Sequence, residues 1–289
     1  MYPAQFEYHK ALSVQEAVSL LGKLGDDAKL LAGGHSLIPA MKLRLAQPKH
    51  LIDIGKIPGL SGIREQGNAI VIGGTTTHWT VESSTLLKQK CPVLSETAAI
   101  IGDPQVRNMG TLGGSLAHAD PAADYPAVVL ALGVELKAVG PKGERTIKID
   151  DFFKDVMTTA LGAGEVLTEI RVPAPAAGTV GAYKKFPHPA SRFAVVGVAA
   201  VLTLDAKGVC QKASIAITGA GPKATRAKGV EAALQGKALD AATIQAASEK
   251  AADGIDVQAD LQGSVEYKRH ITKVYTRRAI EAALARAKK

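Results

Sequence analysis

Short apolar runs separated by glycine-rich turns fill the first part of the chain. Ser13 and Glu16 have the spacing of a capping box, which opens a helix. This helix is expected to end near Gly25, because apolar side chains recur with helical spacing up to that point, at Val14, Ala17, Leu20, Leu21 and Leu24. Residues 28–31 and 50–54 predict short strands on either side of a brief helix, so residues 1–56 are expected to form a βαβ-like α/β subdomain.

Residues 57–175 predict a second α/β subdomain. Its expected strands cover residues 62–64, 69–72, 134–139, 145–149 and 166–172. Its expected helices cover residues 79–87, 93–101 and 127–132. Residues 117–126 predict an ordered loop, because the residue before each proline in this stretch disfavours helix. Gly140-Pro141-Lys142-Gly143 is expected to turn a hairpin.

The pattern changes after a linker, Pro-Ala-Pro-Ala-Ala-Gly at residues 173–178. Long runs of Val, Ile, Leu and Ala then predict three strands, at residues 182–186, 194–204 and 209–218. Three helices are expected to follow, at residues 224–234, 240–252 and 265–288. Residues 179–289 are therefore expected to form a C-terminal domain, a three-stranded antiparallel sheet with a helical bundle, and the predicted fold class is α+β.

Charge and composition narrow the classes of partner. The 289 residues include 35 Lys and Arg against 27 Asp and Glu, which gives a net charge of +8. These charges are scattered except in the expected C-terminal helix, whose basic face either docks an acidic partner or is simply solvated. Aromatic residues make up only 4% of the chain, so the base-stacking surface of a nucleic-acid-binding protein is not expected.

The number of cysteines limits which metal cofactors the chain can bind and indicates the redox compartment in which it works. Cys91 and Cys210 are the only cysteines, too few for an iron–sulfur cluster or a four-cysteine zinc site. A disulfide framework is equally excluded, which indicates a reducing compartment such as the cytoplasm. Residues 1–10 lack the apolar segment of a signal peptide, and no run of 18 apolar residues predicts a membrane span.

Two glycine-rich segments are the candidates for ligand binding. Residues 32–37 read Ala-Gly-Gly-His-Ser-Leu, and residues 111–115 read Thr-Leu-Gly-Gly-Ser. Glycines let backbone N–H groups approach a ligand closely, and successive N–H groups at a helix start hold phosphate. Together the two segments predict two clamps on one extended diphosphate ligand. A third segment, Gly-Gly-Thr-Thr at residues 73–76, either packs beside the same ligand or is a plain turn.

These segments resemble a known family over most of their length. Residues 32–39 (Ala-Gly-Gly-His-Ser-Leu-Ile-Pro) with 41–44 (Met-Lys-Leu-Arg) resemble the first flavin-binding motif of the medium subunits of the aerobic carbon monoxide dehydrogenase family. Residues 107–117 resemble the second motif, and residues 120–126 (Asp-Pro-Ala-Ala-Asp-Tyr-Pro) resemble its continuation. The resemblance runs from about residue 3 to residue 289 and is specific to the flavin subunits of the molybdenum hydroxylases.

The resemblance implies a subunit that binds one FAD noncovalently in a domain of the vanillyl-alcohol-oxidase type, with residues 1–56 and 57–175 as its two subdomains. It implies two partners, an iron–sulfur small subunit with [2Fe–2S] clusters and a large subunit with a molybdenum cofactor, arranged as a dimer of heterotrimers. Electrons would pass from the clusters through FAD to an external acceptor. A cytoplasmic location is expected, with peripheral association at the inner face of the membrane left open.

The resemblance also implies residue roles. Backbone N–H groups along the first motif would wrap the FAD pyrophosphate, with a hydroxyl from the serine: Ala32, Gly33, Gly34, His35, Ser36 and Leu37. The second motif would meet the pyrophosphate and the isoalloxazine side with Thr111, Gly113, Gly114 and Ser115, and His118 would lie close by. Asp124 would bind the polar tail of the cofactor, Leu161 and Val166 would line the ring, and Lys185 or its neighbour Lys184 would lie near the flavin. No catalytic side chain and no metal ligand is expected.

Three alternatives stay open at this point. The chain could serve a related hydroxylase that oxidises a purine, an aldehyde or an N-heterocycle, because a flavin subunit does not touch the substrate. It could be a stand-alone flavin oxidase, although no flavin-attachment motif and no substrate domain are evident. It could also be a scaffold protein that has lost FAD, which the intact glycine segments argue against.

Overall fold

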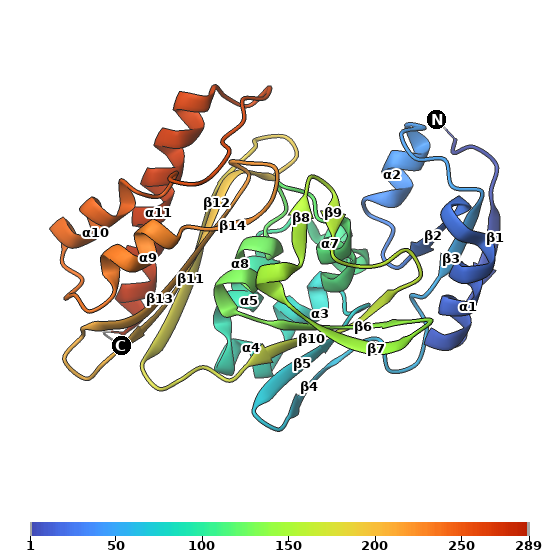
Figure 1. Cartoon of the computed structure of the whole chain (residues 1–289), viewed down its shortest axis with the longest axis horizontal. Helices are drawn as coiled ribbons and strands as arrows, with labels where there is room; N and C mark the ends of the chain where they lie inside the picture. The colour runs from blue at the N-terminus through green and yellow to red at the C-terminus, as the bar shows by residue number, and fades with distance from the viewer. Residues whose placement is uncertain (1, 288–289) are drawn as a thin grey trace.

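Three larger sheets follow one another along the chain in the computed structural model, which describes residues 2–287, and a small two-stranded sheet accompanies the second of them. In Figure 1 they run from the N-terminal elements at the right, through the central sheet, to the C-terminal sheet and helices at the left. This mixture of helices and sheets confirms the predicted α+β class. Within residues 2–287, no helix combines the length and apolar character needed to cross a bilayer.

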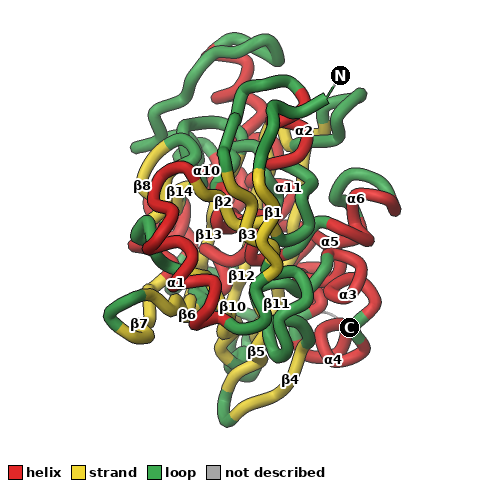
Figure 2. Tube along the Cα trace, turned by 90° about the vertical axis from the view of Figure 1, so that its right-hand side faces the viewer, coloured by secondary structure: helices red, strands yellow, loops and turns green. Residues whose placement is uncertain are grey.

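The N-terminal sheet is parallel, with β3 (His50–Asp53) between β1 (Glu7–Lys10) and β2 (Ala28–Leu31). Figure 2 shows this arrangement from the side. The predicted start of α1 (Val14–Leu24) is confirmed, with Ser13 as N-cap accepting from the Glu16 N–H. The Glu16 carboxylate accepts from the Leu12 N–H, one residue before the partner that a capping box would give it. The short η1 (Gly25–Asp27) leads into β2, and α2 (Leu37–Lys42) follows the first glycine segment. β1 was not expected from the sequence.

The central sheet is antiparallel, in the order β4-β5-β10-β6-β7. Its strands are β4 (Ile63–Gln66), β5 (Ala69–Gly73), β6 (Glu135–Gly140), β7 (Gly143–Lys148) and β10 (Val166–Pro173). The expected hairpin is confirmed between β6 and β7, where Gly140 pairs with Gly143. Between β7 and β10 lie η2 (Ile149–Asp151) and the small pair β8 (Phe153–Asp155) and β9 (Thr158–Thr159).

Six helices join β5 to β6: α3 (His78–Ser83), α4 (Thr85–Lys90), α5 (Pro92–Ala99), α6 (Pro104–Met109), α7 (Leu112–His118) and α8 (Tyr125–Leu132). The single helix expected at residues 79–87 is wrong, because Ser84 leaves the helical conformation and caps α4 through the Leu87 N–H. The α6 helix was not expected, although Asp103 caps it by accepting from Val106.

The expected loop at residues 117–126 is too long at both ends. The α7 helix continues to His118, and α8 already begins at Tyr125. Pro126 lies in the first turn of α8, where a proline loses no helical hydrogen bond, so it starts this helix rather than preventing it. The second glycine pair, expected in a turn, lies within the first turn of α7.

The C-terminal sheet has four antiparallel strands, one more than expected: β11 (Thr179–Pro187), β12 (Ala194–Leu204), β13 (Cys210–Thr218) and β14 (Thr225–Arg226). Because β14 occupies residues 225–226, α9 (Lys228–Leu234) begins later than residue 224. The other helices are α10 (Ala241–Ser248) and α11 (Val265–Ala287). The sheet lies between α11 and α8, which both pack against β12, so the near-continuous burial of β12 follows from contact on both faces.

Candidate functional site

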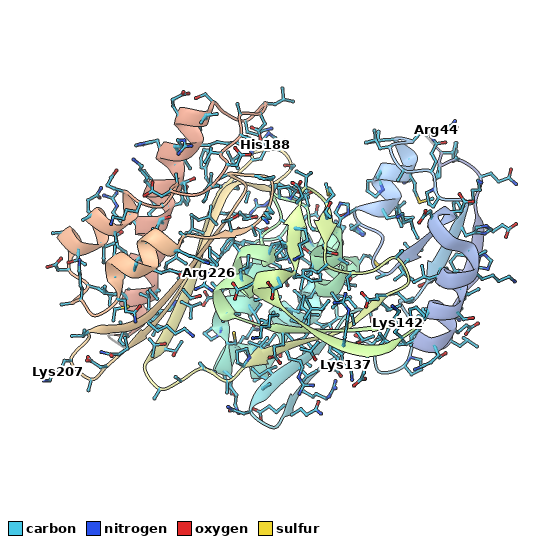
Figure 3. The ribbon with its side chains drawn as sticks, in the orientation of Figure 1. Arg44, Lys137, Lys142, His188, Lys207 and Arg226 are labelled. Atoms are coloured by element: carbon cyan, nitrogen blue, oxygen red, sulfur yellow. The ribbon has the colours of Figure 1, made fainter. Side chains whose placement is uncertain are left out.

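A pocket of about 650 Å³ lies where the two glycine segments meet. Its walls come from the loop between β2 and α2, the start of α3, the first turns of α7, the segment before β10 and the loop after β11. Figure 3 labels Arg44, just after α2, and His188, in the loop after β11, and neighbours of both line the pocket, namely Ala40 and Ala46 on one side and residues 191–193 on the other. The pocket brings together these predicted site residues: Ala32, Gly33, Gly34, His35, Ser36, Leu37, Thr111, Gly113, Gly114, Ser115, His118, Asp124 and Leu161.

The glycines allow the segments to pack backbone against backbone. A Cβ at Gly33 would lie 1.9 Å from the carbonyl oxygen of Met109, two residues before the second segment. A Cβ at Gly113 would lie 2.4 Å from the carbonyl oxygen of Gly74, which accepts a hydrogen bond from the Gly113 N–H. Both distances are shorter than any real Cβ contact, so only glycine fits these positions without moving the backbone. The third glycine segment is therefore part of the same assembly.

The first segment offers unpaired backbone donors. Within the described chain, none of the backbone N–H groups of residues 33–37 donates a hydrogen bond. The next amide, Ile38 N–H, donates to Gly34 O and closes the turn, while the Nδ1 of His35 donates to Gly33 O at 3.1 Å. Consecutive free N–H groups at a helix start form a concave site of positive potential. The segment is thus built to receive an anionic group such as a diphosphate.

The second segment uses its donors within the protein. The Thr111 hydroxyl accepts from the Gly114 N–H at 3.1 Å, and the Ser115 N–H donates to Thr111 O. This segment therefore shapes the wall more than it supplies amide donors. The Ser115 side chain, half-buried in the pocket wall, and His118 at the end of α7 add polar groups.

Asp124 anchors the floor of the pocket in a buried ion pair. The Lys185 ammonium donates to Asp124 Oδ2 at 3.0 Å, and the Tyr183 hydroxyl donates to Oδ1 at 2.7 Å. Lys185 also donates to the carbonyl oxygens of Ile100 and Arg192, which ties the loop after β11 to this floor. Burial raises the pKa of Asp124 above its ordinary value, and the Lys185 ammonium opposes this rise.

Two predicted residues lie outside the pocket wall. Val166 packs in the N-terminal core against residues such as Ala17, because successive strand residues face opposite sides and Leu167 faces the pocket instead. Lys185 lies behind Asp124, with its side chain 4% exposed. Because successive strand residues face opposite sides, the neighbouring Lys184 points away from Lys185 and is exposed to solvent.

His78 and Arg192 line the pocket without having been singled out from the sequence. His78 is buried and packs against the Tyr125 ring, with 5.3 Å between the ring centroids and a tilt of 54°. Its Nδ1 atom has no hydrogen-bond partner among the described residues. Burial lowers its pKa from 6.5 to about 4, so the ring is neutral. The sequence signal that could have identified His78 is its position two residues after the third glycine segment.

The comparisons with known families cover nearly the whole chain. The family described as FAD binding domain in molybdopterin dehydrogenase matches residues 4–175. The family described as CO dehydrogenase flavoprotein C-terminal domain matches residues 181–283. The chain belongs to the flavoprotein subunits of the molybdopterin dehydrogenases.

Individual relatives of this flavoprotein family match end to end. The carbon monoxide dehydrogenase medium chain of Hydrogenophaga pseudoflava is 46% identical over 286 residues, which cover 99% of both chains. The 6-hydroxypseudooxynicotine dehydrogenase complex subunit alpha of Paenarthrobacter nicotinovorans is 38% identical and covers 100% of this chain and 97% of its own. A solved carbon monoxide dehydrogenase from H. pseudoflava, lacking the Mo-pyranopterin moiety of its cofactor, superposes with a TM-score of 0.96 at 48% identity over 99% of both chains.

The pocket fits the FAD of this flavoprotein family on its own chemistry. FAD joins a flat, largely apolar ring to a diphosphate. The free N–H groups of residues 33–37 suit a diphosphate, and the pocket wall includes the apolar side chains of Ile101, Leu161 and Leu167, which suit a flat apolar ring. Arg192, in the loop after β11, adds a cation at the pocket edge.

The neutral His78 makes the folding stability of the flavoprotein depend on pH. The unfolded chain binds a proton on this ring below about pH 6.5, whereas the folded chain does so only near pH 4. The contribution of His78 to the free energy of unfolding is therefore greatest above pH 6.5, and it falls by about 3 kcal/mol as the pH drops to 4. Urea unfolding of FAD-free protein at about pH 7 and about pH 4 should show this extra loss in the wild type and not in His78→Gln. An equal loss in both proteins would contradict the assignment.

Proposed function

We propose that this chain is the flavin subunit of a molybdenum-containing carbon monoxide dehydrogenase, passing electrons from a partner to an external acceptor. The observation that supports this most strongly is the pocket built by both glycine segments, in a chain 46% identical over its length to a carbon monoxide dehydrogenase medium chain. FAD supplies a redox centre that exchanges electrons singly or in pairs. The protein's own groups bind, orient and shield that centre.

The proposed residue roles follow the contacts. The N–H groups of residues 33–37 hold the diphosphate, together with the Ser36 hydroxyl. Leu161 and Leu167 exclude water from one side of the ring. The ion pair with Lys185 fixes the position of the Asp124 carboxylate, which accepts a hydrogen bond from a hydroxyl of the cofactor's polar tail. No residue needs to act as a nucleophile or a general base.

The partners proposed are a small subunit with [2Fe–2S] clusters and a large subunit with the molybdenum cofactor, assembled as a dimer of heterotrimers. The two cysteines of this chain support the placement of the metal cofactors on partner subunits, because both are buried. Burial raises the pKa of Cys91 to about 12, which keeps that thiol inert. We place the complex in the cytoplasm, with contact to the inner face of the membrane as the route to its acceptor.

We also propose three domains, at residues 1–56, 57–175 and 179–289. The family matches at residues 4–175 and 181–283 support the second boundary. The N-terminal core supports the first, and it also includes Ile57, Leu60 and Val166 from beyond residue 56. The central core includes Tyr183 and Ala199 of the C-terminal sheet, so the second and third domains share a packed interface.

The 38% identity to a 6-hydroxypseudooxynicotine dehydrogenase subunit supports a second candidate, a related hydroxylase with an organic substrate. To distinguish the two, the chain is co-expressed with its genomic neighbours, and the purified complex is analysed by visible spectroscopy and for molybdenum, iron and copper. The proposal expects flavin and iron–sulfur bands that bleach with carbon monoxide, and copper in the metal analysis. Bleaching only with an N-heterocycle or aldehyde, without copper, would support the second candidate. A complex without flavin would exclude both.

A further inference from the structure

Three side chains with metal-binding atoms converge on the N-terminal sheet, away from the flavin pocket. Glu7 of β1 and His50 of β3 are paired in the register of the two parallel strands. His9 lies two residues after Glu7 and therefore on the same face of the sheet. None of the three lines the FAD pocket. The site is half-buried, with the His9 and His50 side chains 26% and 19% exposed.

The separations of the three ligand atoms match one face of a tetrahedron. His9 Nε2 lies 3.1 Å from His50 Nδ1, and Glu7 Oε2 lies 3.3 Å from His50 Nδ1 and 3.8 Å from His9 Nε2. Tetrahedral zinc with bonds of about 2.0–2.1 Å to nitrogen or oxygen requires ligand atoms about 3.3 Å apart. The ligand atoms are therefore close enough together to share one ion without rearrangement of either strand.

The charges around the cluster leave room for a cation. Within residues 2–287, the Glu7 carboxylate forms no ion pair with a lysine or an arginine, and its two neighbours within ion-pair distance are the imidazoles. The nearby Lys49 is already engaged with Asp27 at 2.9 Å. The two imidazole nitrogens are within hydrogen-bonding distance of each other, so in the ion-free chain a ring proton joins them. A proton bridges only one pair of these atoms, whereas a metal ion accepts from all three.

We infer that Glu7, His9 and His50 bind one divalent transition-metal ion of the zinc class, with water completing the coordination. Two imidazole nitrogens and one carboxylate oxygen are ligands that zinc accepts, and calcium and magnesium prefer oxygen alone. The ion fastens β1 to β3, the central strand of the sheet whose other edge, β2, leads into the first glycine segment. Its role is structural and separate from electron transfer.

The test uses the full-length, FAD-loaded chain without a histidine tag, stripped with a chelator and titrated with Zn²⁺ against a chromophoric competitor. The inference expects one tight zinc site per chain. It also expects a loss of affinity of at least about 100-fold in His50→Ala and in Glu7→Gln, more than the loss of a group that only orients a ligand causes. The Glu7 side chain is 73% exposed, so Glu7→Gln keeps the fold, which circular dichroism and flavin content check.

The matched control is His270→Gln, which removes an exposed histidine of α11 outside the cluster and should leave zinc affinity unchanged. Zinc should also raise the melting temperature of the wild type and of His270→Gln, and not of Glu7→Gln, because an ion that binds only the folded chain stabilises it. Absence of a tight zinc site in the wild type would overturn the inference. Equal affinity in the wild type and both cluster variants would do so as well.

Discussion

Replacing Gly33 by alanine is expected to lower FAD affinity by at least about 100-fold, equivalent to about 3 kcal/mol. The added Cβ would lie 1.9 Å from the Met109 carbonyl oxygen, and neither backbone can yield without separating the two glycine segments. Such a shift moves the free N–H groups of residues 33–37 off the diphosphate, and each hydrogen bond to a charged group contributes about 1.5–3 kcal/mol. Fluorescence titration of the flavin-free chain with FAD measures the effect.

Gly22→Ala is the matched control for this substitution. Gly22 lies within α1, and a Cβ there meets no atom within 4 Å. Alanine in a helix is about 1 kcal/mol more favourable than glycine, so this variant should bind FAD normally and unfold at slightly higher urea. Wild-type affinity in Gly33→Ala would contradict the role given to the contact between the segments.

Replacing Asp124 by alanine is expected to destabilise the flavin-free protein by about 3–5 kcal/mol. The substitution leaves the Lys185 ammonium buried, with 4% of its side chain exposed, and without its carboxylate partner. It also removes the acceptor of the Tyr183 hydroxyl. Urea unfolding without FAD measures this loss separately from any change in cofactor binding.

Asp27→Ala tests whether burial causes the effect. Asp27 pairs with Lys49 at 2.9 Å, a distance like that of the buried pair, but the side chains are 52% and 71% exposed. Loss of such a surface pair costs at most about 1 kcal/mol. Similar losses in Asp27→Ala and Asp124→Ala would show that the buried pair has no special part in holding the pocket floor.

Elements with local signals were predictable, and elements that depend on distant partners were not. The N-cap at Ser13 and the hairpin at residues 140–143 need only neighbouring residues, and both are present in the structure. β1 has the sequence Glu-Tyr-His-Lys, without an apolar alternation, and forms because β3 offers it a parallel edge. The break of the expected helix at Ser84 depends on a capping hydroxyl that competes with helix continuation.

The same distinction applies to the site. The two glycine segments carry their signal locally, and the structure brings them into one pocket. Arg192 lies at that pocket in a loop that is held by distant and local contacts, among them the hydrogen bond from Lys185 of β11 to the Arg192 carbonyl oxygen. Val166 was assigned to the ring side by resemblance, whereas strand parity turns Leu167 toward the pocket. β10 has a register shift between Leu167 and Glu169, so Leu167 lies in the same core as Ile170 and Val172 while Val166 lies in the N-terminal core, and a regular alternation read from the sequence does not separate the two neighbours.

The most direct test of the account is the flavin stoichiometry of the purified full-length chain. The account predicts one FAD per chain, released intact on denaturation and taken up again by the flavin-free protein with return of the flavin spectrum. A chain that stays colourless in excess FAD, or that retains flavin covalently after denaturation, would contradict the binding site described for residues 33–37 and 111–115.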